Sequence, residues 1–116
     1  MVGTSAVLFG LAAVGGITLA AMHFMKKPLP LPLAIVHGLV AATGLVLLII
    51  AVATGASATL AVASLVLFII AALGGFVLFS FYIRKQPLPS ALVVIHGLVA
   101  VAGFVTLLAS LVKGSA

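Results

Sequence analysis

Four long apolar runs constrain the fold of this chain more than any other feature. They cover approximately residues 5–25, 32–53, 58–83 and 90–112. At a rise of 1.5 Å per residue, about 20 residues of α-helix cross a hydrocarbon core of about 30 Å, and every run is long enough. The runs are about twice as long as a membrane β-strand and show no alternation of polar and apolar residues. We therefore expect membrane-spanning helices in a lipid bilayer.

Short breaks rich in proline, glycine and lysine separate the runs. Proline disfavours the α conformation in the residue before it, so the first helix is expected to end near Lys26, just ahead of the Pro28–Pro32 segment. Pro32 suits the first turn of the following helix, where a missing N–H costs nothing. The first run starts without a cation, so we expect a retained span and not a cleaved signal peptide. The predicted fold is all-α: an integral membrane four-helix bundle forming one domain over residues 1–116.

The chain contains an internal duplication. Residues 3–57 align with residues 62–116 at a shift of 59, with 23 identities in 55 positions. A Pro-Leu-Pro motif follows the first and third runs, and the sequence HGLVA at 37–41 recurs at 96–100. We therefore expect each repeat to form one helical hairpin. Because each hairpin has two spans, the two copies are expected to share one topology and to be related by a pseudo-twofold axis along the membrane normal.

Charge suggests an orientation and excludes several functions. The chain has five Lys or Arg, no Asp or Glu, and no Cys. This excludes carboxylate-dependent hydrolysis, carboxylate cages for Mg²⁺ or Ca²⁺, and Cys-ligated metal centres. Four of the five cations lie in two segments, 26–32 and 84–90: Lys26, Lys27, Arg84 and Lys85. The positive-inside rule places these loops in the cytoplasm and both termini outside. We expect a multi-pass protein of the bacterial inner membrane. The cations are not expected to bind nucleic acid.

Three histidines are the residues best suited to carry chemistry. An ionisable residue inside a span suggests a functional site. His37 and His96 occupy the same place in the two repeats, at one depth near the cytoplasmic side. The positions one, two and three turns further along their helices are Ala41, Gly44 and Leu48 in one copy and Ala100, Gly103 and Leu107 in the other. We expect both stripes to face the bundle interior.

The stripes and the histidine pair predict a haem b site. Two neutral imidazoles on diagonal helices form a bis-histidine ligand set. In this hypothesis His37 and His96 are the metal ligands, small residues such as Gly44 and Gly103 leave room, and cations such as Lys26 and Arg84 lie near the propionates. Each imidazole then needs a backbone carbonyl or hydroxyl as its second partner, because the chain has no carboxylate. A zinc site with His23 as third ligand is disfavoured, since no anionic fourth ligand exists.

The Pro-Leu-Pro and His-Gly unit resembles that of small bacterial four-span membrane proteins built from this helix-pair repeat. The pair of histidines also makes the bundle similar to membrane b-type cytochromes. That resemblance implies electron transfer between quinones and partner subunits, although this chain is smaller and has only three histidines. Small multidrug transporters are excluded, because they depend on a glutamate within the membrane and this chain has none.

Three functional interpretations follow from the sequence. The leading one is a small b-type haem-binding or electron-transfer subunit that is not itself an enzyme. The alternative is a structural or accessory subunit of a larger membrane complex, without a cofactor, in which small residues and histidines serve only packing. The third is self-association through the small-residue face Ala12, Gly16 and Ala20.

Overall fold

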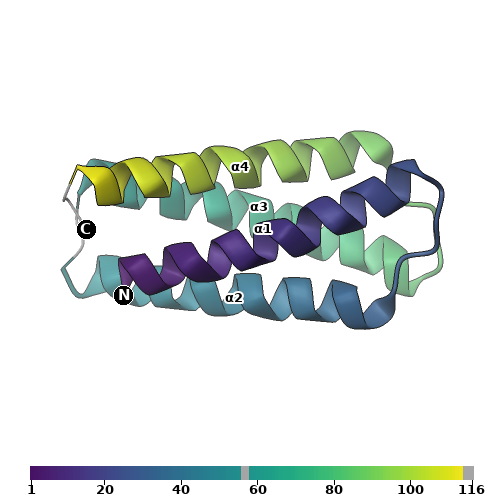
Figure 1. The fold of residues 1–116 in the computed structure, drawn as a ribbon, viewed down its shortest axis with the longest axis horizontal. Helices are drawn as coiled ribbons and strands as arrows, with labels where there is room; N and C mark the ends of the chain where they lie inside the picture. Colours follow the sequence, from purple (N-terminus) through teal and green to yellow (C-terminus); the bar gives the residue numbers. More distant parts are fainter. Residues whose placement is uncertain (56–57, 114–116) are drawn as a thin grey trace.

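The structure is a computed structural model that describes residues 1–55 and 58–113. It contains four α-helices: α1 (Val2–Phe24), α2 (Leu31–Ala53), α3 (Thr59–Ile83) and α4 (Ser90–Val112). They run antiparallel to their neighbours in a bundle of 42 × 20 × 19 Å (Figure 1). The predicted all-α four-helix bundle is confirmed. The final residues of both repeats, 56–57 and 114–116, lie outside the described residues.

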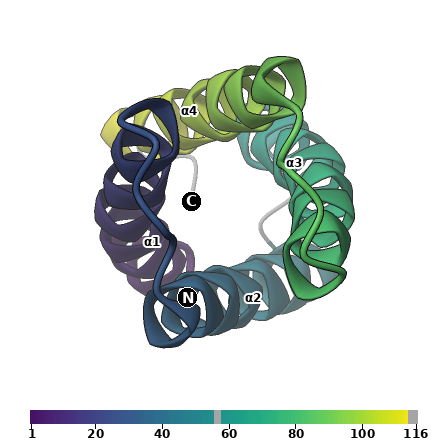
Figure 2. The ribbon, with the colours of Figure 1, turned by 90° about the vertical axis from the view of Figure 1, so that its right-hand side faces the viewer.

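The helices follow one another around a square when the bundle is viewed along its length (Figure 2). The contacts between α1 and α2 and between α3 and α4 are extensive, whereas those of α1 with α4 and of α2 with α3 are fewer. The molecule is thus two tight hairpins laid side by side. As expected from a sequential arrangement, α2 and α4 lie diagonally opposite each other.

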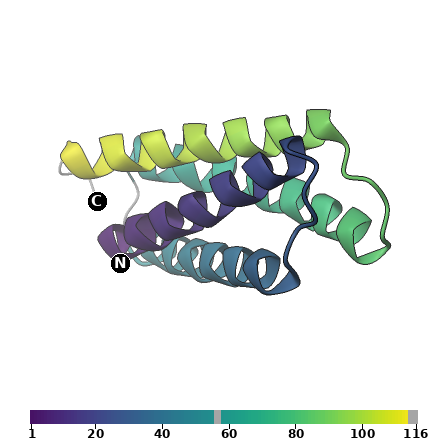
Figure 3. The same cartoon turned by 45° about the vertical axis from the view of Figure 1, so that its right-hand side comes forward.

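The helix ends differ by a few residues from the sequence-based bounds, and hydrogen bonds at the first loop explain where α1 ends. The Lys26 N–H donates to the His23 carbonyl, and the Lys27 N–H donates to Met22. Lys26 has φ +57°, a left-handed conformation that closes the last turn of a helix. Lys85 repeats this conformation after α3, with φ +55°. We call residues 25–30 and 84–89 the two Pro-Leu-Pro loops; both lie at the end of the bundle opposite the chain termini (Figure 3).

All four helices are long and apolar enough to cross a membrane. Large apolar side chains cover the outside of the bundle; on α1 these include Val7, Leu11, Val14 and Ile17, each at least 60% exposed. Exposed threonines on this surface donate to the carbonyl four residues earlier, as Thr18 does to Val14 at 2.9 Å. Because hydrocarbon offers no hydrogen-bond partner, this outer surface suits a lipid bilayer.

The closely packed core occupies the half of the bundle near the termini. Leu48 and Leu107 are fully buried, and the rings of Phe9 and Phe68 stack with centroids 3.7 Å apart. The buried Ser5 hydroxyl donates to the Gly44 carbonyl at 2.9 Å and so links α1 to α2. From the level of the histidines towards the Pro-Leu-Pro loops, the residues are only partly buried or exposed. The fully buried core therefore lies on the terminal side of the candidate site.

Candidate functional site

The site consists of two imidazoles on diagonal helices. His37 on α2 and His96 on α4 lie at matching positions, about 9 Å along each helix from its start. Their ring centroids are 6.4 Å apart and their planes meet at 88°. The duplicated sequence motif thus brings two histidines together inside the bundle, each of them partly buried.

A backbone carbonyl of the neighbouring helix holds each imidazole. His37 Nδ1 lies 2.7 Å from the Ala12 oxygen on α1, and His96 Nδ1 lies 2.8 Å from the Ala71 oxygen on α3. Because a carbonyl oxygen can only accept, Nδ1 carries the proton in both rings. Nε2 of each neutral imidazole is then a free acceptor, and it has no hydrogen-bond partner within residues 1–55 and 58–113. This bond fixes the tautomer that a metal ligand needs.

Glycines on α1 and α3 allow the rings to approach so closely. A Cβ at Gly16 would lie 2.9 Å from His37 Cε1, and one at Gly75 would lie 3.2 Å from His96 Cε1. Real side chains essentially never come within 3.0 Å in this way, so a larger residue at Gly16 would displace the ring. Gly16 and Gly75 follow the acceptor residues Ala12 and Ala71 by one turn, which explains how an imidazole reaches a carbonyl inside a helix.

The structure assigns a different place to two glycines that the sequence put beside the cofactor. Gly44 faces Leu8 and Phe9, and Gly103 faces Leu67 and Phe68. They lie two helical turns from the histidines, towards the termini, and let the stacked phenylalanines approach α2 and α4. The expected interior stripe is confirmed, since Gly44, Leu48, Gly103 and Leu107 are all buried. The ring-facing glycines were detectable as the Gly-Gly pairs 15–16 and 74–75 that recur in the duplication.

Small side chains separate the histidines from the phenylalanine pair. Ala12 and Ala71 are 5% exposed. Ala41 and Ala100, one turn beyond the histidines on α2 and α4, are partly buried. On the small-residue face of α1, Ala12 is buried and Gly16 contacts His37, so these two residues pack against the inside of the chain.

His23 does not join the histidine pair. Its Nε2 shares a hydrogen bond of 3.0 Å with the Ser90 hydroxyl at the start of α4. At the equivalent position of the second repeat, the Tyr82 hydroxyl donates to the Leu29 carbonyl at 2.8 Å. Both bonds connect one hairpin to the other at the loop end of the bundle. His23 and Tyr82 therefore have a structural role that their positions in the sequence did not predict.

The cations near the site have different surroundings. Arg84 turns back along α3: its Nε and Nη2 donate to the carbonyl and hydroxyl of Ser80, both at 3.1 Å, and its guanidinium lies 4.9 Å from the centre of the Phe81 ring. Arg84 is thus held against its own helix. Lys26 and Lys27 are exposed in the first loop. Lys85 is also exposed, but it lines a hollow between the loops.

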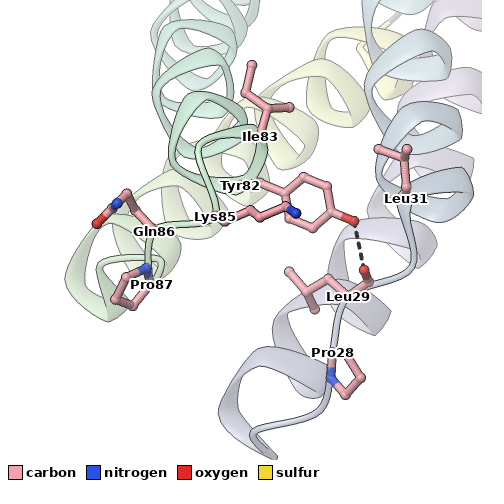
Figure 4. A pocket seen from close by; sticks show the side chains of 8 residues that line it. All are labelled: Pro28, Leu29, Leu31, Tyr82, Ile83, Lys85, Gln86 and Pro87. Atoms are coloured by element: carbon pink, nitrogen blue, oxygen red, sulfur yellow. Dashed lines mark hydrogen bonds between the residues drawn. The ribbon is translucent and has the colours of Figure 1, made fainter.

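This hollow has a volume of about 840 Å³. It lies between the two Pro-Leu-Pro loops, near the end of α3 and the start of α2 (Figure 4). Its lining residues are Pro28, Leu29, Leu31, Tyr82, Ile83, Lys85, Gln86 and Pro87. The histidines do not line it, so it is distinct from the imidazole pair.

Comparisons with known proteins assign no family to this chain. No protein-family model matches it, and no curated protein or solved structure does so either. The functional argument therefore depends on the residues and the geometry described above.

Proposed function

We propose that the chain is a small membrane-bound b-type haem protein in which His37 and His96 are the axial ligands. One observation carries the proposal: two imidazoles on diagonal helices, each fixed through Nδ1 on a backbone carbonyl, have ring centroids 6.4 Å apart. Metal–imidazole bonds of about 2.0–2.1 Å, with about 1 Å more from each nitrogen to its ring centre, give a separation of about 6 Å across one metal ion. The spacing thus supports bis-histidine ligation.

The residues around the pair have the properties that such a site requires. The carbonyls of Ala12 and Ala71 orient the rings and leave both Nε2 atoms as acceptors. Gly16 and Gly75 let the rings lie directly against α1 and α3, and Ala41 and Ala100 keep the next turn of each histidine helix small. Bound haem supplies one-electron transfer, whose potential depends on the axial ligands and on burial.

The site would place haem in a strongly positive part of the protein. Four cations lie at this end of the bundle and the whole chain lacks acidic side chains, which favours an anionic cofactor. In this proposal the propionates point towards the Pro-Leu-Pro loops, where Lys26 is exposed and Arg84 lies beside Ser80.

A visible spectrum of the detergent-purified chain tests this function. We expect protein produced with sufficient haem to be coloured, with a sharp Soret band that shifts on reduction. Colourless protein should give the same spectrum when it is titrated with haem to one equivalent. A protein that remains colourless and takes up no haem would contradict the proposal and favour the cofactor-free accessory subunit.

The orientation in the bacterial inner membrane is a separate prediction. Lys26, Lys27, Arg84 and Lys85 lie at one end of the bundle, and Lys113 follows α4 at the other. The positive-inside rule then puts both Pro-Leu-Pro loops in the cytoplasm. A single cysteine at Gln86 should resist an impermeant thiol reagent in intact cells and react after the membrane is opened. A cysteine at Gly3 is the matched control and should react from outside; reversed labelling would contradict the assignment.

A further inference from the structure

We propose that the hollow between the two Pro-Leu-Pro loops binds one anionic phospholipid, with the phosphate at Lys85 and an acyl chain along the apolar wall. Its volume of about 840 Å³ is in the range of small-molecule sites, about 300–1,000 Å³. This site is separate from the histidine pair, so the inference does not depend on haem binding.

Charge identifies the kind of headgroup. Lys85 lines the hollow, and three further cations lie in or beside the same two loops. The chain contains no Asp or Glu, so no side chain of the protein can neutralise them. At the end of a membrane-spanning bundle, the abundant anions are lipid phosphates, and basic residues beside spans attract anionic lipids. The counterion for Lys85 is therefore expected from the bilayer.

Lys85 follows α3, and its side chain reaches the hollow. Its φ of +55° lies in the left-handed region, where glycine is the usual residue after a helix. A long side chain is nevertheless kept at this strained position, and Figure 4 shows it extending into the hollow beside Tyr82. Lys26 has the same conformation but does not line the hollow, so the feature that distinguishes Lys85 is the reach of its side chain.

The walls of the hollow favour a lipid over a small soluble phosphate. Leu29, Leu31 and Ile83 contribute apolar surface, and Leu31 and Ile83 are 46% and 60% exposed on the outside of the bundle. The Tyr82 hydroxyl is bonded to the Leu29 carbonyl, which holds the two walls together (Figure 4). A phosphate next to a membrane-facing apolar wall matches the interfacial region of a phospholipid.

Native mass spectrometry of the full chain in detergent tests the proposal. The protein is titrated with phosphatidylglycerol and with phosphatidylcholine of identical acyl chains. We expect phosphatidylglycerol to bind more tightly and Lys85→Gln to weaken it about fivefold, the contribution of one lysine near a membrane surface. Lys26→Gln is the matched control: it removes the same charge from the same left-handed backbone position, but Lys26 does not line the hollow.

Three results would overturn the proposal. Equal affinity for both lipids would exclude selection by charge, and equal losses in Lys85→Gln and Lys26→Gln would indicate diffuse attraction. Displacement of the lipid by an equal concentration of glycerol phosphate would show a site for small phosphates.

Two further variants keep the test valid if Lys85→Gln fails to fold. Lys85→Arg should retain the preference for phosphatidylglycerol, and Leu29→Trp should block the hollow without a change of charge. Circular dichroism checks that each variant remains helical.

Discussion

His37→Ala and His96→Ala are each expected to abolish the low-spin haem spectrum. A six-coordinate iron needs both axial ligands. The third histidine of the chain, His23, cannot replace either of them, because it is bonded to Ser90 away from the pair. Either substitution leaves one imidazole and a gap among small residues. The measurement is the Soret band and its shift on reduction, together with the amount of haem retained per chain after gel filtration.

His23→Ala is the matched control for these variants. It also removes an imidazole from a span, but His23 is bonded to Ser90 at the end of the bundle. We expect its spectrum to stay close to that of the unchanged protein. Identical spectra for all three variants would contradict ligation by His37 and His96. A colourless parent with mild effects throughout would support the packing interpretation, in which the imidazole–carbonyl bonds only join α1 to α2 and α3 to α4.

Gly44→Leu and Gly103→Leu should each destabilise the bundle by about 1–3 kcal/mol, the usual effect of overpacking. A Cβ at either glycine would already lie 3.3 Å from its nearest neighbour, Leu8 or Leu67, and next to a stacked phenylalanine ring. Three further carbons would have to displace Phe9 or Phe68 from the best-packed part of the core. The measurement is the free energy of unfolding in detergent, followed through loss of helical signal.

Gly38→Leu and Gly97→Leu provide the control within the same helices. A Cβ at either position would have no atom within 4 Å. Both variants carry the same change of helix propensity as the core pair without the clash. We therefore expect stability equal to or above that of the parent. If all four variants are equally stable, the packing of the phenylalanine pair against α2 and α4 is wrong.

The histidine site links these two predictions. The phenylalanine stack fixes the bundle on the terminal side of the site, while the bonds of His23 and Tyr82 fix it on the loop side. Between them lie the imidazoles and a layer of alanine and glycine. A site bounded at both ends and small in the middle suits a flat cofactor that is inserted between helices.

The sequence alone determined the number of spans, their approximate ends and the duplication. Length and apolar composition are sufficient for this, because hydrocarbon requires each span to satisfy its backbone within one helix. Equal spacing in the two repeats also placed His37 and His96 at one depth. The need of each imidazole for a backbone partner followed from the absence of acidic residues. These properties depend on local chemistry and on sequence spacing.

Only the tertiary structure decided which groups meet. The sequence placed Gly44 and Gly103 on the histidine stripes; the structure packs them against the phenylalanine pair and puts Gly16 and Gly75 at the rings. It also turned His23 and Tyr82 into links between hairpins. In a soluble helix, polar residues mark the outer face, but here both faces are apolar, so periodicity distinguishes them poorly. The inner face is chosen by close packing between helices, which a single-helix pattern does not contain.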